Sequence, residues 1–148
     1  MRFLLVDRID SLTPGVSVVA VRTVPIDDEY LQDHFPGFPV VPGVLLTEMM
    51  AQAAGKCLDA ERRPRGKAML AKILSASFRQ WVAPGSKTFL HAQIATNTDR
   101  YATADCHVEV DGKKVAQASL FFSFLPIEHF VAGYRDEVLE HYLSEHTQ

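Results

Sequence analysis

A histidine and a glutamate stand fourteen positions apart in the first third of the 148-residue chain, on the two sides of a loop rich in proline and glycine. These are His34 and Glu48. Imidazole is the side chain best suited to proton transfer near neutral pH, and a carboxylic acid in an apolar setting can stay protonated and donate its proton. Together the two predict a reaction in which one proton is removed and another delivered, although a loop histidine taken alone more often has no role.

The segment between the two residues predicts a rigid loop followed by a helix. Residues 34–43 contain prolines at 36, 39 and 42, and each proline restricts the residue before it to extended backbone. Pro42 suits the first turn of a helix, and the residues that follow are mostly Leu, Met, Ala, Glu and Gln, which favour helix. We therefore expect a helix of about four turns over residues 43–59.

Glu48 and Gln52 lie one turn apart on this predicted helix, and nearly all its other residues up to Ala54 are apolar. The narrow polar pair has two interpretations. One is a solvent-facing stripe that Lys56 and Asp59 continue. The other is a pair that faces an internal site, and the apolar run favours it. A buried carboxylate needs a partner or must be neutral.

The predicted start of this helix, Pro42-Gly43, is a candidate oxyanion site. The first backbone N–H groups of a helix have no partner within it and carry a partial positive charge. A glycine at this position lets a ligand oxygen come close to the backbone.

The rest of the chain predicts strands that surround this helix. Residues 16–24 are rich in β-branched residues and read as a strand ended by Pro25, and Asp111-Gly112 is a strong two-residue hairpin signal. The pattern is α+β, with about five mostly antiparallel strands wrapped around one helix. The four later strand-like segments are residues 66–80, 87–98, 101–110 and 113–124.

The residues after Pro126 predict an amphipathic helix, because apolar side chains recur there at helical spacing. A length near 150 residues fits one domain, so we treat residues 1–148 as a single domain with a helical extension over about 126–148.

Composition excludes several functional classes. A net charge of -3 gives no general case for nucleic-acid binding. No run approaches the roughly 20 apolar residues that span a bilayer, and no export signal is recognisable, so we expect a cytoplasmic protein. Cys57 and Cys106 lack the spacing of a disulfide framework or zinc site, and we expect both to be buried. The remaining histidines carry no motif and are expected to be structural or exposed: His91, His107, His129, His141 and His146.

The loop and the helix together form one long patterned string that resembles the signature of the FabZ-type 3-hydroxyacyl-acyl-carrier-protein dehydratases, members of the hot-dog fold superfamily. Weaker likenesses extend the resemblance over roughly residues 3–124, at residues 5–8, 77–79, 82–85, 110–112 and 115–116. The string consists of His34-Phe35-Pro36-Gly37, Pro39, Pro42-Gly43-Val44-Leu45, Glu48 and Ala51-Gln52-Ala53-Ala54-Gly55.

The resemblance implies a hot-dog protomer whose antiparallel sheet wraps the central helix, and an obligate homodimer. Each active site would join His34 of one chain to Glu48 of the other. Family members also assemble as trimers of dimers, so the resemblance leaves a hexamer open.

The resemblance also assigns roles in the removal of water from a 3-hydroxyacyl thioester, in fatty acid or related acyl-chain biosynthesis. His34 would act as the base and Glu48 as the acid that protonates the leaving hydroxyl. The Gly43 N–H would stabilise the enolate-like oxygen, Val44 would contact the substrate, and Gln52 would orient Glu48. No metal or organic cofactor is expected.

The partner that the resemblance implies is acyl carrier protein, which is acidic and delivers its substrate on a phosphopantetheine arm. The chain has a basic segment that would suit such a partner, although a solvated surface stretch explains it equally well. The docking candidates are Arg62, Arg63, Arg65, Lys67, Lys72 and Arg79.

Three other functions stay open. A hot-dog thioesterase would use a carboxylate to activate water, a dehydratase-isomerase typically carries aspartate where Glu48 stands, and an acyl-binding scaffold would lack a catalytic side chain. The joint presence of His34 and Glu48 favours dehydration. Gln80-Trp81 replaces the arginine and proline common in the family, which leaves the acyl chain length open.

Overall fold

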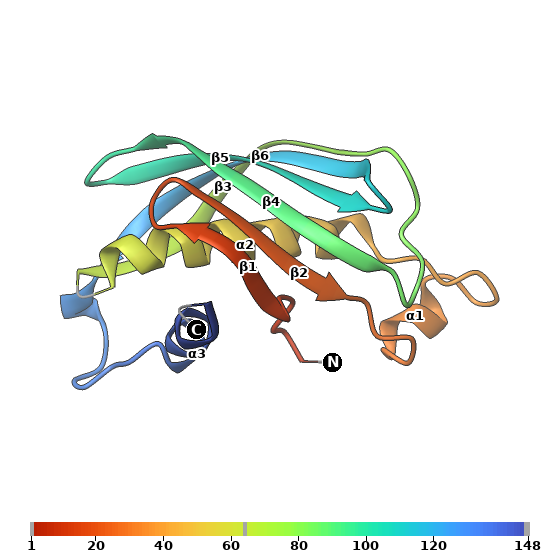
Figure 1. Ribbon diagram of the computed structural model, residues 1–148, viewed down its shortest axis with the longest axis horizontal. Coiled ribbons are helices and arrows are strands. Elements are labelled where there is room, and N and C mark those ends of the chain that lie inside the picture. Colours follow the sequence, from red (N-terminus) through yellow and green to blue (C-terminus); the bar gives the residue numbers. More distant parts are fainter. Residues whose placement is uncertain (1, 64, 147–148) are drawn as a thin grey trace.

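The computed structural model describes residues 2–63 and 65–146. In this part of the chain, six strands form one antiparallel sheet in the order β1-β2-β4-β5-β6-β3. The sheet wraps the long helix α2, and the C-terminal helix α3 lies beside β1 (Figure 1). The elements are β1 (Arg8–Thr13), β2 (Ser17–Thr23), α1 (Tyr30–Asp33), α2 (Gly43–Arg62), β3 (Gly66–Phe78), β4 (Lys87–Asn97), β5 (Tyr101–Val110), β6 (Lys113–Pro126), the 3₁₀ turn η1 (Ile127–His129) and α3 (Glu137–His146).

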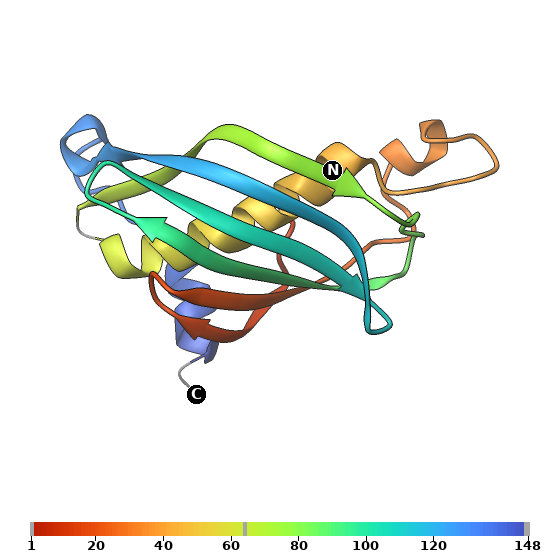
Figure 2. The same cartoon turned by 90° about the horizontal axis from the view of Figure 1, so that it is seen from above.

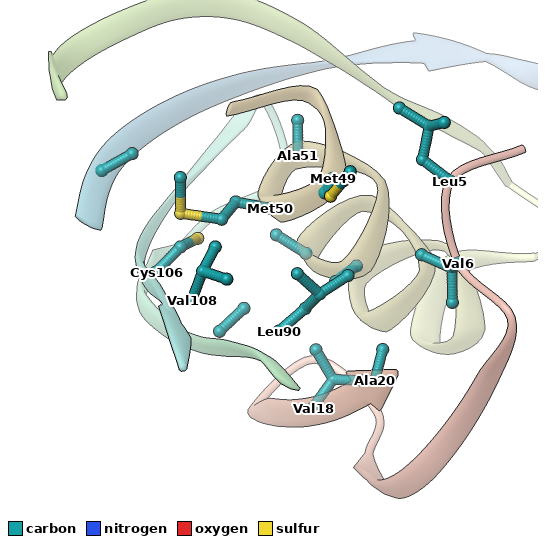
Figure 3. Close-up of a cluster of buried hydrophobic side chains, with 14 of the residues drawn as sticks. Leu5, Val6, Val18, Ala20, Met49, Met50, Ala51, Leu90, Cys106 and Val108 are labelled. Carbon is teal, nitrogen blue, oxygen red and sulfur yellow. The ribbon is translucent and has the colours of Figure 1, made fainter. Parts of the chain in front are cut away.

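The core lies between α2 and the inner face of the sheet. Along β4 and β5, alternate residues are buried, as expected of strands with one face on a core. Leu90 and Val108 are fully buried there and belong to the same core cluster as Met49 and Met50 of α2 (Figure 3). Burial of each such side chain contributes roughly 1.5–3 kcal/mol, so this layer holds α2 in place.

The hairpin predicted at Asp111-Gly112 is confirmed. Asp111 has a φ of 52° and Gly112 a φ of 77°, and positive φ at both central residues defines the turn that matches the twist of two paired strands. β5 and β6 flank this turn and pair from Val110 and Lys113 onward.

The strand β1 was missed by the prediction of about five strands. Only Ile9 of β1 is buried, so the segment lacks the alternating apolar pattern that reveals a strand. It forms because the turn at Pro14-Gly15 folds it back on β2, where Arg8 pairs with Val21.

The prediction of a helix starting near Pro126 was wrong, because α3 begins only at Glu137. Gly133 adopts a φ of 75°, which is outside the helical range. Asp136 then caps the helix, since its Oδ1 accepts a hydrogen bond of 2.9 Å from the Leu139 N–H. The apolar spacing did identify the docked face, as Leu139 and Tyr142 are buried and the Tyr142 hydroxyl donates to the Val6 carbonyl.

Candidate active site

The N-terminus of α2 presents free backbone donors. The first helical hydrogen bonds are donated by Leu45 and Leu46 to the Pro42 carbonyl, so the amides of Gly43 and Val44 precede the bonded turns and are available to a ligand. A methyl group added at Gly43 would come within 3.1 Å of the Phe78 ring. A larger residue at this helix start would therefore have to displace the Phe78 ring of β3 by a few tenths of an ångström.

His34 is held by the loop that it begins. Its Nδ1 lies 3.0 Å from the Val40 carbonyl oxygen, and the Val40 N–H donates back to the His34 carbonyl at 2.8 Å. Because a carbonyl only accepts, Nδ1 must carry the proton, which leaves Nε2 of the neutral ring as an acceptor. The ring stacks on Phe35 with centroids 4.2 Å apart, across a cis peptide bond. This is the tautomer that a general base requires.

Gln52 contacts Glu48, one turn earlier on α2. Gln52 Nε2 donates to Glu48 Oε1 at 3.1 Å and to the Phe3 carbonyl at 2.7 Å. Gln52 Oε1 accepts the Leu5 N–H at 2.8 Å. The amide of Gln52 is thus fixed by the backbone of residues 3–5, and it holds one carboxylate oxygen of Glu48 in place.

The start of α2 is only partly buried in the single chain. Val44 is 76% exposed, and Glu48 is only partly buried. The loop that precedes α2 extends past the end of the sheet (Figures 1 and 2). Two large side chains of the same loop, Phe35 and Phe38, are also more than half exposed.

An apolar groove of about 360 Å³ runs along α2 from Glu48. It lies between α2, the first part of β3 and the N-terminal segment. Sequence reasoning did not find it, because its walls come from four separate segments: the N-terminal residues, α2, β3 and β6. Its lining residues are Phe3, Leu4, Glu48, Ala51, Gln52, Gly55, Lys56, Asp59, Lys67, Ala68, Met69, Leu70 and Phe122.

A cluster of charged side chains closes the end of this groove that is distant from Glu48. Lys67 Nζ lies 3.0 Å from Asp59 and also donates to Asp136 in the C-terminal tail. Lys56 Nζ lies 3.6 Å from Asp136. Burial lowers the pKa of Lys56, and the positive charge of Lys67 lowers it further. We call these four residues the tail cluster, since Asp136 joins the tail to the groove.

Ion pairing outweighs burial at two members of the tail cluster. Burial alone would lower the pKa of Lys67, but its bonds to Asp136 and Asp59 raise it. Burial alone would raise the pKa of Asp136, but the hydrogen bonds from Lys67 and the Leu139 N–H hold it below its usual range. Both groups are therefore charged at neutral pH, which keeps the tail docked.

His34 and Glu48 have separate partners in this chain. Within residues 2–63 and 65–146, the polar contact of the His34 ring is with Val40, and that of the Glu48 carboxylate is with Gln52. The loop that carries His34 projects beyond the end of α2 (Figure 1).

Two of the six basic docking candidates are engaged inside the protein. Arg62 is 7% exposed, its guanidinium lies 3.5 Å from the centre of the Phe124 ring, and it donates to Asn97. Lys67 belongs to the tail cluster. Both side chains are therefore engaged within the protein and are not available to a docking partner. The sequence could not show this, because their partners lie on β4, β6 and the tail.

The other four candidates are exposed and lie at different places. Arg63 and Arg65 flank the C-terminal end of α2, whereas Arg79 directly follows Phe78, which packs at Gly43. The two ends of α2 are about 28 Å apart at 1.5 Å per residue. Lys72 lies between them on β3.

The family of the chain follows from comparison with known proteins. A model described as the FabA-like domain matches residues 1–119. The chain is 40% identical over 120 residues to the 3-hydroxyacyl-[acyl-carrier-protein] dehydratase FabZ of Lactobacillus helveticus, covering 80% of this chain and 81% of that one. It is 42% identical to the protein of the same name from Pediococcus pentosaceus, covering 80% of each chain. The chain belongs to the FabZ dehydratase family.

The FabZ family consists of hydro-lyases, so the enzyme class predicted from the sequence is confirmed. The part of the chain from η1 onward lies beyond the matched residues 1–119. The tail cluster therefore joins two residues of α2 and one of β3 to an aspartate outside the matched region. Sequence reasoning had no signal for this aspartate.

Solved structures show the fold alone. The conserved protein PA5202 from Pseudomonas aeruginosa superposes with a TM-score of 0.65 at 18% identity, covering 80% of this chain and 87% of that one. The Escherichia coli PaaI protein gives a TM-score of 0.62 at 15% identity, covering 79% and 78%. These neighbours confirm the hot-dog fold. None of the helices described here is long and apolar enough to span a membrane.

Proposed function

We propose that residues 1–148 form one hot-dog domain that removes water from a 3-hydroxyacyl thioester, with His34 as base and Glu48 as acid. The observation that carries this proposal is the fixed tautomer of His34, whose Nε2 is free to accept a proton. A second support is the carboxylate that Gln52 holds at the head of an apolar groove.

The proposed reaction uses each group once. His34 Nε2 takes the proton from the carbon next to the thioester carbonyl, and the electron pair forms the double bond to the 3-carbon. The bond from that carbon to its hydroxyl breaks, and Glu48 gives the hydroxyl a proton, so that water leaves. The Gly43 N–H stabilises the charge that develops on the carbonyl oxygen. A proton then passes from His34 to Glu48 through water to reset the site.

We propose that the active site is composite, with His34 of one chain beside Glu48 of a second copy. The support is an edge strand that a second copy would cover. β3 is the outermost strand beside β6, and a long exposed edge with apolar side chains is a site for pairing with another chain. Its large apolar residues Met69, Leu70, Ile73, Leu74 and Phe78 are 38–53% exposed. A hexamer of three such dimers remains compatible with this proposal.

The groove along α2 is our candidate for the acyl chain. Its apolar walls suit methylene groups, and Glu48 at its head places the reacting carbons at the helix start. The tail cluster forms its other end. A hydrocarbon tail that reached these charges would leave them without water, which is costly. The acyl chain is therefore expected to end before Lys56 and Asp59.

We propose acyl carrier protein as the substrate donor and a cytoplasmic location. Arg79 and Lys72 are the docking candidates that lie on or directly after β3, while Arg63 and Arg65 are more distant from Gly43. Both cysteines are free and buried, which fits a reducing compartment.

The test of this function is hydration of a crotonyl thioester on acyl carrier protein, with thiol release scored in the same samples. His34→Ala and Glu48→Gln should each lower water addition by about 10²- to 10⁴-fold. The exposed pair His129→Ala and Glu128→Gln are matched controls that should keep the full rate.

Other outcomes would contradict or extend the proposal. Thiol release without water addition would indicate a thioesterase. Formation of a 3-enoyl product would add isomerase activity to the site, and acyl binding with neither reaction would indicate a scaffold. The same assay with the coenzyme A thioester decides whether the carrier protein is required.

A further inference from the structure

Two histidines and a glutamate converge on the outer face of the sheet, away from α2. His91 on β4 pairs directly with His107 on β5, and Glu109 follows two positions along β5. Residues two apart in a strand point to the same side. Their neighbours Leu90, Cys106 and Val108 point the opposite way, into the core. The three side chains therefore stand together on rigid central strands.

The two imidazoles share one carboxylate. His107 Nε2 lies 2.9 Å from Glu109 Oε1, and His91 Nε2 lies 3.5 Å from Glu109 Oε2. The rings are stacked with centroids 4.4 Å apart and planes 7° from parallel. One ligand atom from each of the three residues lies within 4.8 Å of the others.

This spacing matches a tetrahedral metal site. With metal–ligand bonds of about 2.0–2.2 Å, neighbouring ligand atoms are roughly 3.3 Å apart. The two distances to Glu109 lie on either side of that value. The imidazole rings, which stand parallel in the metal-free protein, would have to turn toward each other to share one ion. Each of the three residues is also partly exposed, and His91 and His107 line an open hollow of about 690 Å³. Water can therefore complete the coordination.

We propose that His91, His107 and Glu109 bind a divalent transition metal, with Zn²⁺ as the best match. Two imidazoles and one carboxylate are a ligand set that zinc uses, whereas Mg²⁺ and Ca²⁺ prefer oxygen ligands alone. The site lies on the face of the sheet opposite to α2 and the groove of Glu48. The metal therefore joins β4 to β5 and stabilises the sheet, and it takes no part in the dehydration.

The test uses metal-free protein from which any affinity tag has been cut. Equilibrium dialysis against Zn²⁺ should give one tightly bound ion per chain. Co²⁺ in its place should give the strong visible absorption of a tetrahedral site, which a merely hydrogen-bonded cluster cannot produce. Zn²⁺ should also raise the melting temperature of the wild type, since it binds the folded state.

Two variants assign the ion to this cluster. His91→Ala and Glu109→Gln should weaken Zn²⁺ binding by more than the roughly 10- to 100-fold that loss of an outer-shell partner costs, and should abolish the Co²⁺ spectrum. Glu109→Gln keeps the size of the side chain, so it also serves if His91→Ala fails to fold. The control His129→Ala should bind as the wild type does. Unchanged binding in the two variants, or no bound ion in the wild type, would overturn the proposal.

Discussion

Gly55 gives the sharpest test of the groove along α2. It lies seven residues after Glu48, about 10 Å along a helix that rises 1.5 Å per residue. It lines the groove, and a Cβ added there meets nothing within 4 Å. A leucine at this position should therefore fit the fold, and its side chain should occupy the space that we assign to the acyl chain.

The expected magnitude follows from the methylenes displaced. Each buried methylene is worth about 0.8 kcal/mol, so displacing roughly three of them costs about 2.4 kcal/mol, or about 60-fold in kcat/KM. A four-carbon substrate does not reach Gly55 and should react at the wild-type rate. Replacing a helical glycine by leucine should also raise the free energy of unfolding by up to about 1 kcal/mol.

The assay is kcat/KM for carrier-protein thioesters of increasing chain length, measured for the wild type, Gly55→Leu and Gly55→Ala. Gly55→Ala is the matched control, because it gains helix propensity and adds only a methyl group. For Gly55→Leu, kcat/KM should begin to fall at a shorter acyl chain than for the wild type. For Gly55→Ala it should fall at the same chain length as for the wild type. An unchanged profile in Gly55→Leu would refute our placement of the acyl chain.

Three further predictions follow from the contacts of the site, the tail and the core. Gln52→Ala should lower kcat with little change in KM, because Glu48 loses its orienting bond, and it should destabilise the fold by about 1–3 kcal/mol through the unpaired backbone groups. Gln52→Glu cannot donate to Glu48 either and should also lower kcat, so a wild-type kcat in both variants would argue against orientation. The pKa of Asp136 is held below its usual value, so its carboxylate contributes to the docking of α3. This contribution should be complete above about pH 4, the ordinary pKa of aspartate, and should be lost as the pH falls further. Hydrogen exchange of α3 across that range should show the step in the wild type and not in Asp136→Asn. Burial raises the pKa of Cys57 to about 11 and of Cys106 to about 12. At pH 8 about one thiol in 10³ or fewer is therefore ionised, and iodoacetamide should label both cysteines only after unfolding. Rapid labelling of the native protein would contradict their burial.

Local chemistry made the central elements predictable from sequence. Asp111-Gly112 specifies its turn through backbone conformations that few residues adopt. The loop and helix around Glu48 were predicted because proline placement and helix propensity agree over a long stretch. Glu48 and Gln52, one turn apart on the predicted helix, are hydrogen-bonded in the structure.

Features that depend on distant partners were not predictable in the same way. Arg62 reads as a surface base, yet its guanidinium packs on Phe124, sixty-two positions later. His91 and His107 stand sixteen positions apart on different strands, and only the register of β4 and β5 brings them together. Asp136 meets Lys67 through a tail whose path no local pattern specifies.

We propose that His34 and Glu48 act together from two chains. Purified mixed dimers of His34→Ala and Glu48→Gln chains, carrying different removable tags, test it directly through the rate of dehydration. A composite site predicts that one of the two sites in each mixed dimer regains both side chains, so that the mixed dimer has about half the wild-type activity. If the mixed dimer is as inactive as either variant alone, both residues must act within one chain and the account is contradicted.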